Sequence, residues 1–192
     1  DNLLAIAYQC LLKDAKRSGT SAVEDFTNGL IEVCEGQSLD KEFECRKNVS
    51  IDEYINMISK KTAALSETCC SIGAKLGGGS PMEVRALKKY GKFLGLAFQI
   101  QDDLLDIMAD EIELGKKIGG DLLEGKKTYL LLRAFEKAKG KDYKKIKKVI
   151  DNNGIKESEI ESYKHLYSKL GVIEEASNEV KKYSNLALNA LK

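Results

Sequence analysis

The stretch SPMEVRALKKYGKFLGLAFQIQDDLLDIM, residues 80–108, decides the fold class of this chain. It opens with Ser80, Pro81 and Glu83, an arrangement that caps the free amides of a first helical turn and places proline where a helix tolerates it best. No breaking residue follows until Gly115. We therefore expect one long, mostly buried helix from Met82 to about Gly115, its apolar side marked by Leu87, Leu94, Phe98, Leu105 and Ile112.

Gly91 and Gly95 lie one helical turn apart within this stretch. Glycine has no Cβ, so another backbone can approach a helix closely at such positions. The pair therefore predicts a tightly packed neighbour.

The rest of the chain continues the helical pattern in both directions. Apolar residues recur every three or four positions, and Ser50 with Glu53 has the form of a second capping box. No segment alternates like a half-buried strand, so the sequence predicts a single all-α domain over residues 1–192. Helices are expected over residues 1–16, 22–40, 50–76 and 126–139, a glycine- and lysine-rich loop over 115–125, and two or three further helices broken at Asn153-Gly154 and Gly171.

Composition excludes several classes of protein. The chain has 192 residues, 43% hydrophobic and 32% charged, which is enough for a sizeable core and unlike a disordered chain. A net charge of +1 gives no reason to expect a nucleic-acid partner. No apolar run approaches the roughly 18 residues that a transmembrane helix needs. The cysteines are expected to be reduced core thiols, which fits a cytoplasmic protein: Cys10, Cys34, Cys45, Cys69 and Cys70.

Four polar residues lie inside the most apolar helix. The spacing of these residues makes them project over one side of a helix. Like charges so placed repel, and an uncompensated buried charge is costly, so a cation is expected beside them. Oxygen ligands without histidine or cysteine favour Mg²⁺, which also takes phosphate oxygens and water. The alternative is a solvated stripe whose carboxylates pair with lysines. The residues are Gln99, Asp102, Asp103 and Asp106.

Lysines and glycines follow this group directly. Lys116 and Lys117 precede Gly119-Gly120-Asp121, and Lys126 and Lys127 come next. Lysine ammonium groups suit phosphate oxygens, and a glycine-rich segment exposes backbone amides that can bind anions. Carboxylates, a hard metal ion and lysines together indicate a diphosphate site.

Four motifs resemble those of a known family. The segments 91–106 and 115–128 are similar to the second aspartate-rich motif of the trans-isoprenyl diphosphate synthases and to the lysine-bearing segment after it. This family includes farnesyl and geranylgeranyl diphosphate synthases. Lys61-Thr62 resembles its lysine-threonine pair, and Gly36-Gln37-x-x-Asp40 resembles its glycine-glutamine-aspartate element. The order and spacing of the motifs also agree with the family.

The resemblance implies an isoprenoid synthase-type bundle of long antiparallel helices around a central cavity. It also implies a homodimeric, Mg²⁺-dependent prenyltransferase that condenses isopentenyl diphosphate with an allylic diphosphate as metal ions and lysines stabilise the departing diphosphate. By motif, Asp102, Asp103 and Asp106 would bind metal, with Asp102 the first choice. The implied catalytic residues are Lys61, Thr62, Gln99 and Lys116, and the implied diphosphate-binding residues are Lys61, Lys116, Lys126, Gln99 and Gln37.

One element of the family pattern is absent from these residues. The first aspartate-rich motif, which supplies the opposing metal ligands, is not found, and residues 1–5 resemble the helix that follows it. We expect the chain to be the C-terminal part of a longer protein and, taken alone, to be catalytically inactive with an apolar face exposed. The alternative is an inactive regulatory subunit of a heteromeric synthase. A terpene cyclase is a weaker option, because cyclases usually lack the segment 115–128.

The remaining aromatic residues have simpler interpretations. His165, the single histidine, is expected at the surface, since one histidine cannot make a zinc site. Tyrosines at helical spacing from apolar neighbours are expected in the core: Tyr8, Tyr54, Tyr90 and Tyr129.

Overall fold

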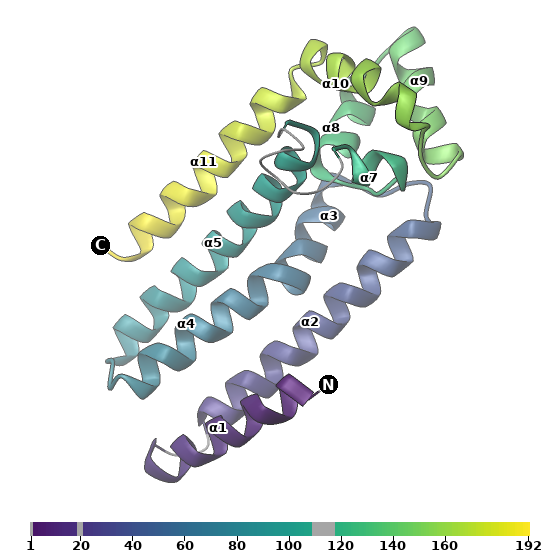
Figure 1. Ribbon diagram of the computed structural model, residues 1–192. Coiled ribbons are helices and arrows are strands. Elements are labelled where there is room, and N and C mark those ends of the chain that lie inside the picture. Colours follow the sequence, from purple (N-terminus) through teal and green to yellow (C-terminus); the bar gives the residue numbers. More distant parts are fainter. Residues whose placement is uncertain (1, 19–20, 109–117) are drawn as a thin grey trace.

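The structure, a computed structural model, describes residues 2–18, 21–108 and 118–192, and over these ranges it contains helices and no strand (Figure 1). This confirms the predicted all-α fold. Four long helices, α2, α4, α5 and α11, lie side by side, α1 folds back along α2, and the short helices gather at one end (Figure 1). The elements are α1 (Asn2–Ser18), α2 (Ser21–Cys45), α3 (Ile51–Ile58), a π-helical segment η1 (Ser59–Ala63), α4 (Ala64–Leu76), α5 (Pro81–Met108), α7 (Gly120–Leu123), α8 (Tyr129–Lys137), α9 (Gly140–Asp151), a 3₁₀ turn η2 (Glu157–Glu159), α10 (Ile160–Lys169) and α11 (Val172–Ala190).

Capping boxes start two of the central helices, as the sequence predicts. The Glu53 carboxylate accepts a hydrogen bond from the Ser50 backbone at 2.8 Å, and the Ser50 hydroxyl accepts one from the Glu53 backbone at 3.2 Å. Ser80 and Glu83 make the same reciprocal pair ahead of α5. The helical run that begins after Ser50 reaches Leu76, as expected, but it passes through the π-helical segment on the way.

Several predicted boundaries are wrong. Helix α2 continues beyond Asp40 to Cys45, and the predicted loop contains the short helix α7. The helix expected from Lys126 begins only at Tyr129, because Thr128 is its N-cap and accepts a hydrogen bond from the Leu131 backbone. The predicted end of α5, with Ile112, lies outside the described residues.

The glycine pair of α5 does allow close packing. A Cβ on Gly91 would lie 2.5 Å from the carbonyl oxygen of Ser66, and one on Gly95 would lie 2.5 Å from the Cα of Ala63. Neither distance is compatible with a side chain. The backbone of α5 therefore packs directly against η1 and α4, as the sequence predicts.

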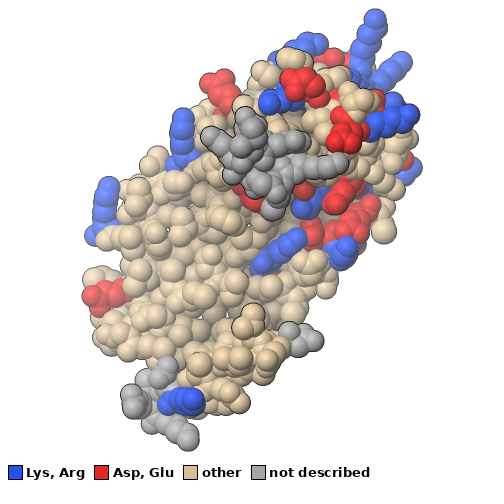
Figure 2. Space-filling model, viewed as in Figure 1, with Lys and Arg blue, Asp and Glu red and all other residues tan. Residues whose placement is uncertain are grey.

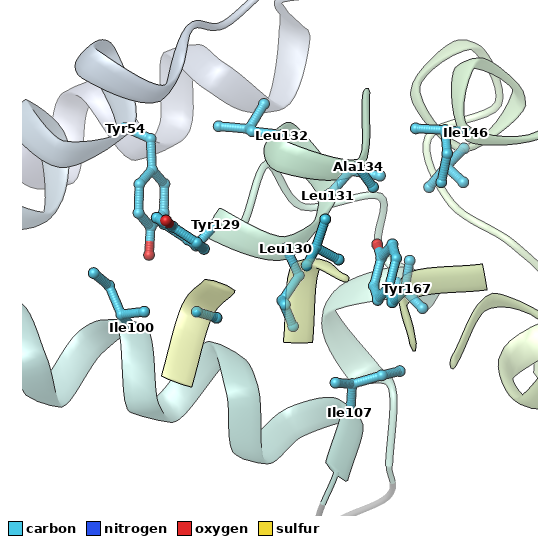
Figure 3. Close-up of a cluster of buried hydrophobic side chains, with 14 of the residues drawn as sticks. Tyr54, Ile100, Ile107, Tyr129, Leu130, Leu131, Leu132, Ala134, Ile146 and Tyr167 are labelled. Atoms are coloured by element: carbon cyan, nitrogen blue, oxygen red, sulfur yellow. The ribbon is translucent and has the colours of Figure 1, made fainter. Parts of the chain in front are cut away.

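The core is densest at the end where the short helices meet α5. Leu131, Ile146 and Ile107 are buried there together with Tyr167 (Figure 3). Helix α8 runs through the middle of this cluster, so three consecutive leucines, residues 130–132, are all buried. Such burial fixes the start of α8, and with it the lysines just before it, against α5.

The expectation that α5 is mostly buried is wrong along one side. Leu94, Phe98 and Leu105 are exposed, Phe98 to 64%, while Leu87 is half-buried. No other described helix packs over this side of α5. Figure 2 shows the surface that results, a broad area over the long helices with almost no charged side chains.

The cysteines and tyrosines also differ in part from expectation. The cysteines are free, as expected, but four of them are exposed and Cys70 is only half-buried, so they are not core thiols. Tyr54 and Tyr129 are buried as expected, whereas Tyr8 and Tyr90 are half-buried. His165 is exposed. Among the helices described, none combines the length and apolarity needed to cross a membrane.

Candidate active site

The site begins where α2 crosses the π-helical segment. A Cβ on Gly36 would overlap the backbone at Lys61, so only glycine permits this approach. The contact brings the next turn of α2 alongside, and Lys61 Nζ lies 2.6 Å from Asp40 Oδ2. π-helical turns within α-helices often occur at functional sites. Here the turn carries Lys61 and Thr62, both predicted site residues.

Thr62 links this segment to α5. Its hydroxyl donates to Gln99 Oε1 at 2.8 Å, and Gln99 Nε2 donates to Asp103 Oδ1 at 3.3 Å. The two hydrogen bonds define which end of the Gln99 amide faces each partner. Thr62 of the π-helical segment is thus linked through Gln99 to Asp103, one turn further along α5.

Asp103 is buried, with 5% of its surface exposed. Its Oδ2 accepts a hydrogen bond from the Tyr54 hydroxyl at 2.6 Å and another from the Tyr129 backbone at 2.9 Å. Burial raises the pKa of Asp103 to about 6, although the hydrogen bonds from Tyr54 and Tyr129 act in the opposite direction. Burial, followed by the charge of Asp103, raises the pKa of Tyr54 well above its usual value, so Tyr54 remains a donor.

Asp106 lies one turn further along α5, against the start of α7. Its Oδ2 accepts a hydrogen bond from the Asp121 backbone at 3.2 Å, and its carbonyl oxygen accepts one from the Gly119 backbone at 2.7 Å. Gly119 has φ of 73°, a left-handed conformation that glycine adopts without strain. Burial and the nearby charge of Asp121 raise the pKa of Asp106 to about 6.

The two adjacent lysines before α8 have different surroundings. Lys126 Nζ pairs with Asp121 Oδ1 at 2.9 Å. Burial disfavours the charge of Lys126, but Asp121, together with the charges of Asp103 and Asp40, raises the Lys126 pKa. Lys127 is buried, with 5% exposed, and donates to the carbonyl oxygen of Glu44 at 3.2 Å. Burial lowers the pKa of Lys127.

Some of these groups line a cavity of about 670 Å³. Its lining includes Gln37, Asp40 and Lys61 from the α2 side, and Lys126 and Lys127 from the α8 side. A narrow pocket beside it shares these charged residues and reaches Gln99 and Asp103. The cavity lies at the end of the molecule where charged side chains gather, next to the uncharged area that covers the long helices (Figure 2).

Asp102 lies outside both pockets, on the exposed side of α5. Its carboxylate has no hydrogen bond or ion pair with any described residue. Within the described ranges, no three carboxylate, thiol or imidazole groups come together as a complete metal site. The oxygen donors Asp102 and Asp106 suit a hard cation such as Mg²⁺, which often takes only one or two carboxylates from a protein. They fit one side of a metal site.

Most of the predicted site residues therefore converge. Thr62 and Gln99 form one hydrogen-bonded group with Asp103. Lys61 lines the narrow pocket together with Gln99 and Asp103, and Lys126 lines the same cavity as Lys61. Gln37 lines that cavity and is exposed. Lys116 lies outside the described residues.

Sequence reasoning missed three residues of this region. In the sequence Asp40 and Asp121 stand out only as parts of motifs, yet they pair with Lys61 and Lys126, two of the lysines that line the cavity. The sequence predicts Tyr54 as a core residue, but its hydroxyl also donates to Asp103. The spacing of Tyr54 before Lys61 carries no chemical signal by itself, because a buried tyrosine is common in any helix.

Comparison with known proteins places the chain. The family model described as polyprenyl synthetase matches residues 1–169. The geranylgeranyl diphosphate synthase of Sulfolobus acidocaldarius is 39% identical over the whole chain, which covers 59% of that relative. A short chain isoprenyl diphosphate synthase of Methanothermobacter thermautotrophicus is 42% identical over 76% of the chain and 45% of the relative.

Solved structures agree with the sequence comparison. A crystal structure of a geranylgeranyl pyrophosphate synthase is 34% identical and superposes with a TM-score of 0.89 over 99% of this chain and 59% of the other. A polyprenyl synthase from Caulobacter crescentus, crystallised with calcium and isoprenyl diphosphate, is 28% identical, with a TM-score of 0.90 over 98% of this chain and 57% of the other. The chain thus spans less than two thirds of the length of these relatives. It belongs to the polyprenyl synthetase family.

Proposed function

We propose that the full-length protein is a Mg²⁺-dependent prenyltransferase that joins isopentenyl diphosphate to an allylic diphosphate and forms a longer trans-prenyl diphosphate. Family membership supports this reaction class. The relatives are named as synthases of isoprenyl, geranylgeranyl and geranylfarnesyl diphosphates.

One observation carries the proposal: a cavity lined by four lysines and three carboxylates lies next to a broad surface with almost no charged side chains (Figure 2). Lys61 and Lys126 line the cavity, whereas Leu65, Leu94 and Phe98 are exposed large apolar residues of α4 and α5. Exposure of a large apolar surface to water is unfavourable and indicates a binding surface, and lysine ammonium groups favour an anion. An allylic diphosphate has the matching form, because its charged head is attached to an apolar chain.

The lysines would bind the diphosphate oxygens. Lys61 and Lys126 are held by Asp40 and Asp121, so their ammonium groups are oriented before a ligand arrives. Such preorganisation lowers the cost of stabilising the charge that develops on a leaving group. Lys116 would add to this set, and Gln37 would lie beside it.

Asp102 and Asp106 would hold Mg²⁺ on this side of the site. When bound, the metal supplies Lewis-acid stabilisation of the departing diphosphate. Asp103 already accepts three hydrogen bonds, so we assign it a supporting role rather than metal binding. Thr62, with Gln37, would lie along the path of the allylic cation, and Gln99, held between Thr62 and Asp103, would form a hydrogen bond near the diphosphate.

The proposal also includes the oligomeric state and the location of the protein. We propose a homodimer in the cytoplasm, by resemblance to the family. An inactive regulatory subunit would have no need to keep two lysines, each paired with its own carboxylate, facing one cavity. The retained pairs therefore support the enzyme over that alternative.

The test is turnover by the full-length protein. Given Mg²⁺, isopentenyl diphosphate and allylic starters of about five to fifteen carbons, we expect release of diphosphate and a longer prenyl diphosphate, detected by chromatography. Absence of product with every starter would contradict the proposal. Activation of a separate active synthase by the inactive protein would then favour the regulatory subunit.

A further inference from the structure

The hydrogen bonds around Asp103 connect four separate elements. Tyr54 comes from α3, Thr62 from the π-helical segment, Gln99 and Asp103 from α5, and the Tyr129 backbone from the first turn of α8. Figure 3 shows the Tyr54 ring reaching across from α3 toward α5 beside Tyr129. The two rings meet edge to face, with centroids 6.2 Å apart. Asp103 is thus the point at which these elements are joined.

Tyr54 provides the shortest of these hydrogen bonds, and its ring is buried. The hydroxyl and the Tyr129 backbone share Oδ2 of Asp103, which leaves Oδ1 facing Gln99. The Tyr54 hydroxyl therefore sets the rotation of the carboxylate. That rotation in turn decides which end of the Gln99 amide faces Thr62, because an amide nitrogen donates and an amide oxygen accepts.

The same carboxylate holds the residue that follows the lysine pair. Tyr129 comes directly after Lys126, Lys127 and Thr128, so its anchored backbone limits where Lys126 can place its ammonium group. A loosened anchor would move both Gln99 and Lys126 relative to Lys61. Displacements of this kind have large effects where several groups must meet one ligand.

We infer that Tyr54 is a positioning residue of the site: by holding Asp103 it fixes the Gln99 amide and the start of α8 in the arrangement that binds diphosphate. The inference rests on the proposed function. Tyr54 itself does not need to touch the ligand. A tyrosine with only a packing role would contribute to stability and leave ligand affinity unchanged.

The experiment compares Tyr54→Phe with Tyr163→Phe in the full-length protein. Tyr163 is a matched control, since it is equally buried and its hydroxyl donates to the Lys145 carbonyl oxygen at 3.0 Å, in a part of the fold that lines neither site pocket. Each variant removes one hydroxyl and keeps the ring. Stability to urea, the NMR signal of the Gln99 side-chain amide, and calorimetric affinity for inorganic diphosphate with Mg²⁺ are measured for both.

We expect Tyr54→Phe to shift the Gln99 amide signal and to weaken diphosphate binding by up to about tenfold, because the lost hydrogen bond lies within the protein and affects the ligand only through displacement of Gln99 and Lys126. Both variants should lower the stability to urea. Tyr163→Phe should leave the Gln99 amide signal unmoved and the affinity for diphosphate within about twofold of the wild type. An unmoved Gln99 signal, or equal affinities in the two variants, would overturn the inference. Wild-type protein that binds no diphosphate would instead contradict the proposed function, so the two failures are distinguishable.

Discussion

Two pairs of adjacent, identical residues show that the fold can give neighbouring side chains of the same type different surroundings and different roles. Asp102 and Asp103 lie in the last two turns of α5, and Lys126 and Lys127 precede α8. In the first pair, Asp102 is exposed without a partner among the described residues, while Asp103 is buried under three hydrogen bonds. In the second, both lysines line the cavity, but Lys126 is half-buried and pairs with Asp121, while Lys127 is buried and donates to a carbonyl oxygen at the end of α2.

The difference comes from chain geometry rather than from side-chain type. Successive residues on a helix point about 100° apart, so Asp102 and Asp103 cannot have the same surroundings. Lys127 turns toward the Glu44 carbonyl, one of the last carbonyls of α2, where a cation is favoured by the helix dipole. One member of each pair is thus the more exposed, and the other is buried and joins elements of the fold.

The largest effect is expected at Asp102. Asp102→Ala should lower turnover of the full-length protein by about 10³-fold, because it removes a metal ligand and with it electrostatic stabilisation of the leaving group. The metal-free variant should be at least as stable as the wild type, since its repulsion with Asp106 is relieved. Steady-state kinetics measure the loss of turnover, and thermal unfolding measures the stability of the metal-free variant. Unchanged turnover would show that Asp102 is a solvated surface residue.

We expect the main effect of Asp103→Ala to be on stability, whereas the main effect of Asp102→Ala is on turnover. The change leaves the Tyr54 hydroxyl and the Tyr129 backbone without an acceptor in a buried place, at about 1–3 kcal/mol for each group. We expect the free energy of unfolding to fall by about 3 kcal/mol, measured by urea denaturation. Stability equal to that of Asp102→Ala would remove the distinction between the two aspartates.

Lys126→Ala should weaken binding of diphosphate in the presence of Mg²⁺ by about tenfold, because a charge-assisted hydrogen bond is lost. Lys141→Ala, on the exposed surface of α9, is the matched control and should bind as the wild type does. Calorimetry on both variants decides the point. Equal losses would mean that only the overall charge of the protein matters.

The smallest effect is expected at Lys127. Lys127→Met gives up the hydrogen bond to Glu44 but also removes the cost of burying an ammonium group, so stability should change by about 1 kcal/mol or less. Diphosphate affinity should stay unchanged. A loss of affinity comparable to that of Lys126→Ala would show that both lysines serve the ligand.

The fold was predictable where the signals are local. The capping boxes at Ser50 and Ser80 depend on residues three apart, and Gly91 with Gly95 marks a close approach that only a missing Cβ permits. Exposure was not predictable in the same way. The spacing of Phe98 within α5 indicates an apolar side but not whether another described helix packs over it.

The same distinction between local signals and long-range contacts applies to the residues of the candidate site. Lys61, Gln99 and Lys126 carry motif signals, and the structure brings them around neighbouring pockets. Tyr54 carries no such signal, because its role depends on a contact with Asp103 across 49 positions of sequence. Helical spacing shows that Asp102 and Asp103 point in different directions, so the expectation that both project over one side of the helix is wrong. Which of the two is buried is decided only by the packing of α3 and α8 against α5.

Calorimetric titration of inorganic diphosphate tests the central claim, that these residues form one side of a metal-dependent diphosphate site. The titration is made with Mg²⁺ and with a chelator, for the 192-residue chain, its Asp102→Ala variant and the full-length protein. We predict weak binding by the chain that requires Mg²⁺ and is lost in the variant, and tighter binding by the full-length protein. Equal affinity with and without Mg²⁺, or in the variant, would contradict the account.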